Sequence, residues 1–452
     1  MSASASNLQI GLGRSDITPR VGVELQGYGP FHCRHSDGVR DRLYARALAV
    51  SVNGQRAVLV SCDLIGVSAD ITRRVRERVG AATGLPGERI MVHAIHTHSG
   101  PSVRVYSGWG TPDPVYLELL PGRIAKACLD ALGSLQDATL AHAEVECRGI
   151  ATNRRLDLYC AKTSEEVFDE NWQPPQPELT DTTAHVFRVD DAAGRMIGFF
   201  SYYGCHPVIG GPGCRKIHGD WPGIASNLVE RLHPGATGFF LQGAQGDINA
   251  CRVCMEEPDA LRVLDVIGAR YARVIMKGLE VARPLAIDRL AAAQHHVAFT
   301  RKPMDRGKLA ALLAEQEAVL NAPDARDDAR EVRMAMVYAL ALRTLLERLD
   351  RGEDLSPPEE LHGLRIGPVA FLGGPFEIFR AIKNDVVAAA TAPIPLVMGL
   401  TNNSIGYAFD HAAAAKGGYE SDMVPFICRQ LPFAAIHDEL AAGLLGVDRA
   451  LG

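Results

Sequence analysis

The sequence lacks the features that mark nucleic-acid-binding and membrane-spanning proteins. Its 452 residues carry 47 Lys and Arg against 53 Asp and Glu, which gives a formal net charge of −6. A chain with this balance has no basic surface of the kind that binds nucleic acid. No run of about 18 apolar residues is present, so a transmembrane helix is not expected. These absences favour a protein whose partner is a small-molecule substrate.

Export signals and a disulfide framework are also missing. Residues 1–7 have neither the basic nor the apolar segment of a secretory signal. Ten cysteines spread over this length do not form the dense pattern of secreted disulfide-rich domains. We therefore predict a cytoplasmic protein with free thiols. Cys251 and Cys254 form a lone C-x-x-C pair, and we interpret both as packing residues because no second pair lies at zinc-site spacing.

Strand-like apolar runs alternate with helical patterns along much of the chain. Strands are expected over residues 56–65, 89–95, 196–203, 237–242, 364–372 and 395–400. Helices are expected over residues 68–82, 114–132, 221–231, 260–279, 376–390 and 434–445. This alternation predicts an α/β fold in which helices cover a mixed or parallel sheet.

Residues 301–360 depart from this alternation. Apolar residues between positions 306 and 349 recur at helical spacing, with an interruption at residues 321–324. We predict a helical hairpin inserted into a single domain that spans residues 1–452; it could serve as scaffold, lid or oligomer contact. Residues 160–182 are rich in Glu, Pro and Thr and are expected to form a surface loop. A homo-oligomer is compatible with an enzyme of this size.

The most informative segment is His96-Thr97-His98-Ser99-Gly100-Pro101, which directly follows the apolar run 89–95. An apolar run that stops at a Gly-Pro signal is typical of a buried strand that ends in a turn. Residues two apart on a strand point to the same face, so His96 and His98 can approach one ligand together. Two such imidazoles are metal ligands, acid–base groups or hydrogen-bonded turn residues.

Polar residues also follow several other predicted strands. They are His206, the pair His218 and Asp220, the pair Asp247 and Asn249, then Glu377, and finally Tyr407. In open α/β sheets, functional groups gather at the ends of strands. Each residue alone is explained equally well by a turn or a helix cap. Together they predict one polar functional site.

The sequence resembles the catalytic domain of the neutral ceramidases and their bacterial relatives over nearly its whole length. The matching motifs are Asp16-Ile17-Thr18-Pro19, Gly27-Tyr28-Gly29, Asp41-x-Leu43-Tyr44-Ala45-Arg46-Ala47-Leu48, Ser61-Cys62-Asp63, His96 to Pro101, Asn153-Arg154, His206, Asp220-x-x-Gly223, Gly246-Asp247, Glu377, Tyr407 and Tyr419-Glu420. The His-Thr-His-Ser-Gly-Pro segment is the most specific of them.

This resemblance implies a set of site residues around one Zn²⁺ ion. The metal ligands would be His96, His206, Glu377 and Tyr407. Catalytic roles beside the ion would fall to His98, Tyr419, Arg154 and Asp247. The substrate would be bound by Asn249, Ser99 and Gly100. Asp247 and Asp220 are expected to orient the ligand imidazoles, which usually have such partners.

The chain departs from the family pattern at one functional position. Where the ceramidases carry Gly-Asp-Val-Ser-Pro-Asn, this sequence has Gly246-Asp247-Ile248-Asn249-Ala250-Cys251. Asn249 cannot act as a nucleophile, so a covalent serine route at this position is excluded, whereas attack by metal-activated water is not. The sequence also lacks the immunoglobulin-like C-terminal domain of the family, so we expect a substrate smaller than ceramide.

These features favour a zinc-dependent hydrolase that cleaves the C–N amide bond of a small or amphiphilic N-acyl substrate. The same metal site could instead serve an esterase, a lactonase or a glycoside-cleaving enzyme, because a zinc-bound hydroxide attacks several electrophiles. A non-catalytic binding protein that lost turnover together with the serine is a further alternative.

Overall fold

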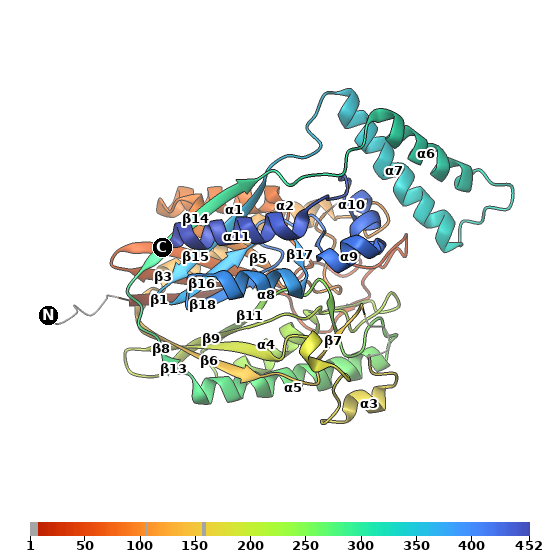
Figure 1. Ribbon diagram of the computed structural model, residues 1–452. Helices are drawn as coiled ribbons and strands as arrows, with labels where there is room; N and C mark the ends of the chain where they lie inside the picture. The colour runs from red at the N-terminus through yellow and green to blue at the C-terminus, as the bar shows by residue number, and fades with distance from the viewer. Residues whose placement is uncertain (1–7, 105, 156–159) are drawn as a thin grey trace.

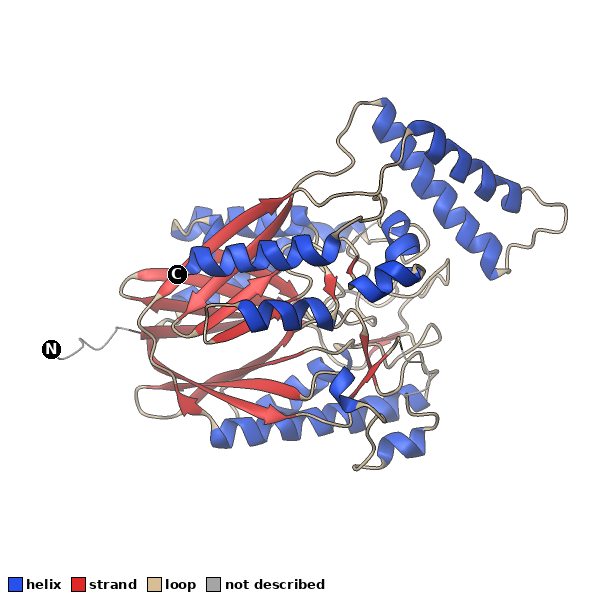
Figure 2. Cartoon of the chain, viewed as in Figure 1, coloured by secondary structure: helices blue, strands red, loops and turns tan. Residues whose placement is uncertain are grey.

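The structure, a computed structural model, describes residues 8–104, 106–155 and 160–452. Residues 1–7, in which no secretory signal was expected, lie outside these ranges. Two β-sheets pack face to face, and helices cover their outer faces (Figures 1 and 2). The predicted α/β fold with a mixed sheet covered by helices is therefore confirmed.

The larger sheet has nine strands in the order β11-β9-β8-β6-β1-β3-β4-β5, with β13 paired to β6. Its strands are β1 (Leu8–Asp16), β3 (Tyr44–Val52), β4 (Gln55–Cys62), β5 (Ile90–Ala94), β6 (Gln136–Glu146), β8 (Thr183–Asp191), β9 (Met196–Tyr203), β11 (Thr237–Gln242) and β13 (Arg283–Pro284). Only two pairs of neighbours, β4–β5 and β9–β11, are parallel. Each parallel pair is joined by a crossover helix, α1 (Ala69–Thr83) or α4 (Asp220–Leu232).

The second sheet has four strands in the order β14-β15-β16-β18. They are β14 (Leu290–Val297), β15 (Glu359–Ile366), β16 (Val369–Gly373) and β18 (Ile394–Met398). The prediction of one strand over residues 364–372 is wrong. Gly367 adopts φ +54° and turns the chain, so β15 and β16 form an antiparallel hairpin.

The helix expected over residues 376–390 is shorter than predicted. Its first residues form β17 (Glu377–Ile378), which pairs in parallel with β19 (Tyr407–Ala408). Helix α8 therefore begins later, at Arg380, and runs over Arg380–Ala389. This short pairing fixes Glu377 opposite Tyr407 and is one of the contacts that build the site described below.

Side chains alternate between two apolar layers along each strand of the large sheet. In β3, Ala45, Ala47 and Ala49 face the helical layer, whereas Leu48 and Val50 face the second sheet. Helices α1 and α2 (Pro114–Gly133) cover one half of the large sheet, and α4 and α5 (Asp259–Val281) cover the other. Helices α8 and α11 (Ile436–Leu451) cover the second sheet. This produces an α/β/β/α sandwich with its central core between the sheets.

The predicted helical hairpin connects β14 to β15 and extends away from the sandwich (Figure 1). It consists of α6 (Arg306–Leu320) and α7 (Arg330–Asp350). The remaining short elements are β2 (Gly38–Val39), β7 (Ala151–Asn153), β10 (Lys216–Ile217), β12 (Ile248–Ala250), α3 (Ser164–Phe168), α9 (His411–Lys416) and α10 (Val424–Ile427). Helix α3 lies within the segment 160–182, which was expected to form a surface loop.

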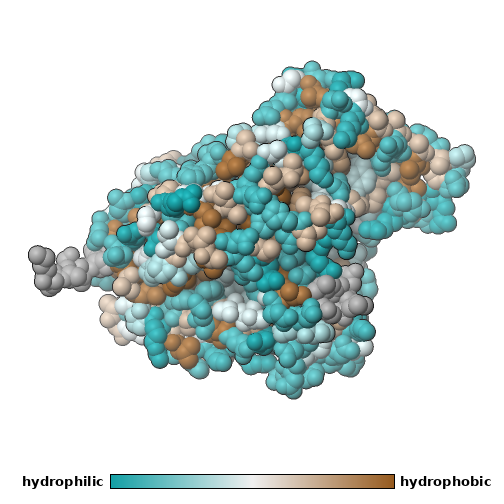
Figure 3. Space-filling view, viewed as in Figure 1, coloured by the Kyte–Doolittle hydropathy of each residue, from teal (hydrophilic) through white to brown (hydrophobic). Residues whose placement is uncertain are grey.

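The molecular surface and the cysteines agree only in part with the sequence-based expectations. On the face in Figure 3, apolar patches are scattered among hydrophilic residues. No helix in the described part of the chain is long and apolar enough to cross a membrane. Cys251 is a buried free thiol, as expected of a packing residue. Cys254 is exposed, so its interpretation as a packing residue is wrong.

Buried neutral imidazoles make the folded state sensitive to acid. The Nε2 atom of His93 accepts a hydrogen bond from the Gln242 backbone N–H at 2.8 Å. Burial lowers the pKa of His93 to about 3 and that of His218 to about 3. Because unfolded histidine titrates near pH ~6.5, the unfolded state binds more protons below that pH. Stability is therefore expected to fall as pH decreases from about 6.5 towards 3, by at most about 1.4 kcal/mol per pH unit for each imidazole.

Urea unfolding at pH 7 and pH 5, in the presence of a chelator, measures this dependence. The His93→Asn variant retains a hydrogen-bond acceptor but no titrating ring, so its stability should change less between the two pH values. The exposed His35 supplies the control, and His35→Asn should behave as the unmodified protein. Equal pH dependence in all three proteins would contradict the role of His93.

A candidate metal centre at the strand ends

The structure brings three of the four predicted ligands into contact. His96 follows β5, His206 follows β9, and Glu377 follows β16. The Oε2 atom of Glu377 lies 2.9 Å from Nε2 of His206 and 3.2 Å from Nε2 of His96. The Nε2 atom of His98 lies 3.2 Å from Nε2 of His96. Three imidazoles and one carboxylate, contributed by both sheets, therefore meet at one point.

Backbone carbonyl groups fix the orientation of two of these imidazoles. Nδ1 of His96 donates a hydrogen bond to the carbonyl oxygen of Ile65 at 2.6 Å. Nδ1 of His206 donates to the carbonyl oxygen of Gln245, also at 2.6 Å. Each proton thus resides on Nδ1, and each Nε2 presents a bare lone pair to Glu377. This is the tautomer that a metal-ligating histidine adopts.

Asp247 and Asp220 do not orient these rings, and the prediction that they do is wrong. Asp247 accepts hydrogen bonds from the backbone N–H of Arg380 at 2.7 Å and from the Asn153 amide at 3.1 Å. Asp220 accepts from the backbone N–H of Trp221. Burial raises the pKa of Asp247 to about 6 and that of Asp220 to about 7. Asp247 therefore links the loop after β11 to helix α8. Its role at the site is structural.

The two histidines of the His-Thr-His segment converge for a reason other than strand alternation. Strand β5 ends at Ala94, before both of them. His96 adopts φ +75°, in the left-handed region that residues other than glycine rarely occupy. Such a conformation costs on the order of 1–3 kcal/mol and persists only where surrounding contacts impose it. A strained turn, rather than a shared strand face, thus brings His96 towards His98.

Tyr407, the fourth predicted ligand, lies beside Glu377 and contacts Arg154. Nη1 of Arg154 donates to the Tyr407 hydroxyl oxygen at 3.2 Å, and the guanidinium carbon lies 4.8 Å from the ring centroid. Burial raises the pKa of Tyr407 although Arg154 opposes this effect, so the phenol is protonated near neutral pH. Arg154 also forms an ion pair with Glu420. The ring of Tyr419 is centred 6.2 Å from that of Tyr407.

The donor set fits a divalent cation of the zinc type. Burial raises the pKa of Glu377, whereas the positive charge that His96 and His206 carry when protonated lowers it well below its usual range. A bound cation supplies the same positive charge while the rings stay neutral. Burial lowers the pKa of His206 and of His98, which disfavours imidazolium. Two bare imidazole nitrogens and an ionised carboxylate oxygen therefore face one another. Lone pairs so placed are stabilised by a shared cation, and zinc accepts this combination of nitrogen and oxygen ligands.

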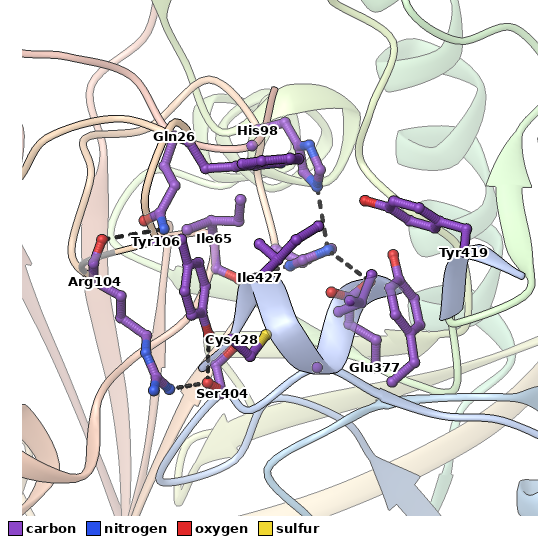
Figure 4. Close-up of a pocket in the computed structure, with 17 residues that line it drawn as sticks. Gln26, Ile65, His98, Arg104, Tyr106, Glu377, Ser404, Tyr419, Ile427 and Cys428 are labelled. Carbon is purple, nitrogen blue, oxygen red and sulfur yellow. Dashed lines mark hydrogen bonds and ion pairs between the residues drawn. The ribbon is translucent and has the colours of Figure 1, made fainter. Parts of the chain in front are cut away.

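His96, His98 and Glu377 form one wall of a small cavity that is partly open to solvent. The polar wall is lined by His96, His98, Glu377, Tyr407 and Tyr419. The rest of the lining, which we call the apolar wall, includes Ile65, Tyr106, Trp109, Val424 and Ile427. In Figure 4, His98, Glu377 and Tyr419 face the same space. A substrate that fills the cavity thus meets an apolar surface and the polar cluster together.

Residues 8–248 match the family model described as "Neutral/alkaline non-lysosomal ceramidase, N-terminal", which covers more than half of the chain. The chain belongs to this family. Its sequence is 27% identical over 265 residues to neutral ceramidase A of Dictyostelium discoideum, covering 54% of this chain and 36% of that protein. It is 27% identical over 237 residues to the neutral ceramidase of Oryza sativa subsp. japonica, covering 50% of this chain and 29% of that protein.

The fold is similar to that of solved members of the family. Neutral ceramidase from Pseudomonas aeruginosa superimposes with a TM-score of 0.74 at 20% identity, over 99% of this chain and 75% of that chain. A ceramidase complexed with C2 superimposes with a TM-score of 0.76 over the same fractions. The alignments to the Dictyostelium and Oryza relatives span only about a third of their length. Glu377, Tyr407 and Tyr419 lie outside the range matched by the family model.

The three residues predicted to bind substrate do not line the cavity of this family member. Ser99 and Gly100 are buried, and their carbonyl oxygens accept hydrogen bonds from the backbone N–H groups of His218 and Gln26. Asn249 lies in β12, where its backbone forms a bridge with His206. The turn that follows His98 directs the chain inward, away from the cavity. The prediction that these residues contact substrate is therefore not supported by the geometry.

The motif Gly27-Tyr28-Gly29 is part of the family resemblance, and the structure shows what its two glycines do. Gly27 adopts φ +118°, and a Cβ atom there would lie 2.5 Å from Nδ1 of His98. A Cβ atom on Gly29 would lie 2.4 Å from the Trp109 ring. Further cavity-lining residues that sequence reasoning missed are Gln26, Arg104, Tyr106, Trp109, Ser404 and Cys428. The glycines make room for an imidazole on the polar wall and an indole on the apolar wall.

Proposed function

We propose that this chain is a zinc-dependent hydrolase that cleaves the amide bond of an N-acyl substrate. The observation that carries the proposal is the approach of two bare imidazole nitrogens, on His96 and His206, to one oxygen of Glu377. These residues and Tyr407 would hold the ion. When bound, zinc supplies a Lewis acid and lowers the pKa of a coordinated water towards ~7.

The chain's own residues would then orient the substrate amide and stabilise the charge that develops on its oxygen. His98 is neutral, since burial lowers its pKa, and its Nε2–H can donate one hydrogen bond. The Tyr419 hydroxyl faces the same space and stays protonated near neutral pH, because burial raises its pKa. Donors of this kind, held before the reaction begins, stabilise an oxyanion. Arg154 holds the Tyr407 phenol in position.

The substrate class follows from the two walls of the cavity. Ile65, Trp109 and Ile427 offer an apolar surface to an acyl chain, while the polar wall meets the amide. The relatives are neutral ceramidases, so a ceramide-type N-acyl amide is one substrate class, and a shorter N-acyl amide is the other. Asn249 occupies the position of the family's serine, so the proposed route uses an activated water and no acyl-enzyme.

A reducing compartment is part of the proposal. The free thiols of Cys251 and Cys254 support a cytoplasmic location, in which such thiols persist. Fractionation of cells that express the full-length protein tests this assignment. Recovery of the protein in a secreted fraction would overturn it.

The proposed activity is tested by metal analysis and a substrate panel. Purified protein should contain one zinc ion at the strand-end site, and removal of zinc with a chelator should abolish hydrolysis until zinc is restored. The panel consists of a long-chain ceramide, a short N-acyl amide, an ester, a lactone and a glycoside. Faster turnover of any of the last three would contradict amidase activity. Bound zinc without turnover of any substrate would indicate a binding protein.

Replacing Gly27 with alanine is expected to lower kcat/KM by about 10²-fold. The added Cβ would displace the His98 imidazole, and a displacement of about 1 Å at a catalytic group costs a factor of this size. Gly54→Ala is the matched control, because Gly54 also has a positive φ (+82°) but no atom within 4 Å of the added Cβ. Equal kinetics in both variants would contradict the positioning of His98 by Gly27.

A further inference from the structure

A second group of metal-ligating side chains lies on the inner face of the large sheet, away from the strand ends. His142 and Glu144 are two residues apart on β6 and therefore share one face. His185 on β8 is directly opposite Glu144 in the antiparallel register. Nε2 of His142 lies 3.1 Å from Nδ1 of His185, and the ligand atoms of all three residues lie within 4.8 Å of one another.

The separation of the two nitrogens suits a shared ion. Nε2 of His142 and Nδ1 of His185 form a hydrogen bond at 3.1 Å, slightly shorter than the roughly 3.3 Å between two ligands bound at about 2.0–2.1 Å to tetrahedral zinc, so a shared ion would replace this hydrogen bond. The rings are held by paired strands and by aromatic neighbours. His142 lies 4.6 Å from Phe187, and His185 lies 5.6 Å from Tyr202, between ring centroids. To share an ion, the hydrogen bond must break and the rings, whose centroids lie 5.3 Å apart and whose planes differ by 15°, must turn towards the ion.

The cluster is accessible and carries suitable charge. Burial lowers the pKa of His142 to about 4 and that of His185 to about 3, so both rings are neutral near pH 7. Glu144 is exposed and contributes a carboxylate. Glu144 and His185 line a polar cleft between the sheet and helix α8 that is open to solvent on one side. An ion can enter through this cleft, and water can complete its coordination.

We propose that His142, Glu144 and His185 form a second site for a divalent transition-metal ion, of which Zn²⁺ is the representative. The site is separate from the strand-end cluster and shares no residue with it. It is independent of the proposed amidase activity. Binding to the folded chain alone would raise its melting temperature.

A third cluster, on the surface near helix α11, provides a matched comparison. Nε2 of His411 is 3.1 Å from Oδ1 of Asp438, and Nε2 of His437 is 2.8 Å from Oδ2 of Asp385. The Nε2 atom of each imidazole is thus already paired with a different carboxylate, and His411 is largely exposed. Its composition resembles that of the sheet cluster, and ligand atoms of His411, His437 and Asp438 also lie within 4.8 Å of one another, but its imidazoles are hydrogen-bonded to carboxylates and not to each other.

Zinc stoichiometry tests the proposal without an activity measurement. The full-length protein is stripped with a chelator, dialysed against ZnCl₂ and analysed for zinc bound per chain. We expect two ions in the unmodified protein and one in His185→Gln. His206→Ala should lose the strand-end ion and retain the sheet ion, so the two sites are scored separately. His411→Ala should still bind two.

Two further measurements distinguish loss of the metal site from loss of the fold. His185→Gln should melt like the unmodified protein when a chelator is present, and only the zinc-dependent rise in melting temperature should disappear. Glu144→Gln, at an exposed position, should fold normally and weaken zinc binding at the sheet site at least about tenfold. An unchanged zinc count in His185→Gln overturns the proposal. So does loss of the second ion in His411→Ala.

Discussion

The variant His206→Ala is expected to lose both the strand-end zinc ion and at least about 10³-fold in kcat/KM. A metal that polarises the substrate and activates water contributes several kcal/mol to transition-state stabilisation, and each 1.36 kcal/mol is a factor of about ten. His206 is central to the proposed site, because its Nε2 atom lies 2.9 Å from Glu377 and its Nδ1 atom is anchored to a backbone carbonyl. Zinc analysis and hydrolysis assays on the same preparation measure both losses.

Two comparisons make this experiment specific. His35→Ala changes an exposed residue that is not a proposed ligand. This variant should keep both zinc and activity. Tyr407→Phe removes only an oxygen donor, so it should retain more zinc than His206→Ala. A His206→Ala protein with full strand-end zinc occupancy would contradict the ligand assignment. Loss of zinc with full activity would contradict the metal-dependent mechanism.

The variant Arg46→Leu is expected to destabilise the fold by about 3–5 kcal/mol, because it leaves the buried carboxylate of Asp63 without its cation. The Arg46 side chain is 1% exposed, and its Nη1 atom donates to Oδ2 of Asp63 at 2.9 Å. Its Nε atom lies 3.5 Å from Glu230, and it also contacts Asn227. Asp63 in turn accepts the backbone N–H of Tyr44 at 2.8 Å. Urea unfolding monitored by circular dichroism measures the loss.

An exposed ion pair and a double variant serve as controls for Arg46. Arg306 pairs with Asp350 on the surface of the helical hairpin, and Arg306→Leu should leave the unfolding midpoint unchanged. Adding Asp63→Asn to Arg46→Leu removes one uncompensated charge and should restore part of the lost stability. If Arg46→Leu unfolds at the same urea concentration as the unmodified protein, the buried pair is not a major stabilising contact.

Elements with a strong local pattern were predictable from the sequence. The expected strands 196–203 and 237–242 coincide with β9 and β11, and the interrupted apolar pattern of residues 306–349 corresponds to α6 and α7. Both rest on hydrophobic periodicity, which the sequence carries directly. Strands β1 and β6 were not predicted. β1 contains two glycines, and its place in the sheet depends on antiparallel pairing with β3, whose residues lie 28 to 44 positions further along the chain.

The composition of the site was more predictable than the orientation of its side chains. The residues that follow different strands converge as the α/β pattern predicts, so His96, His206 and Glu377 meet. The orientation of Ser99, by contrast, depends on the turn after His98, which buries it. The carbonyl acceptors of the ligand imidazoles, such as that of Ile65, were not predictable, since every residue has a backbone carbonyl. Tertiary contacts alone select which carbonyl is used.

The centre is divided between the two sheets, and this has a consequence for biosynthesis. His96 and His206 follow strands of the large sheet, whereas Glu377 and Tyr407 pair through β17 and β19 after strands of the second sheet. A ribosome therefore translates both histidines long before the carboxylate and the phenol that complete the cluster. A nascent polypeptide has no working centre until nearly all of it has emerged. A premature stop codon upstream of Glu377 yields an inert product, however well the first half folds.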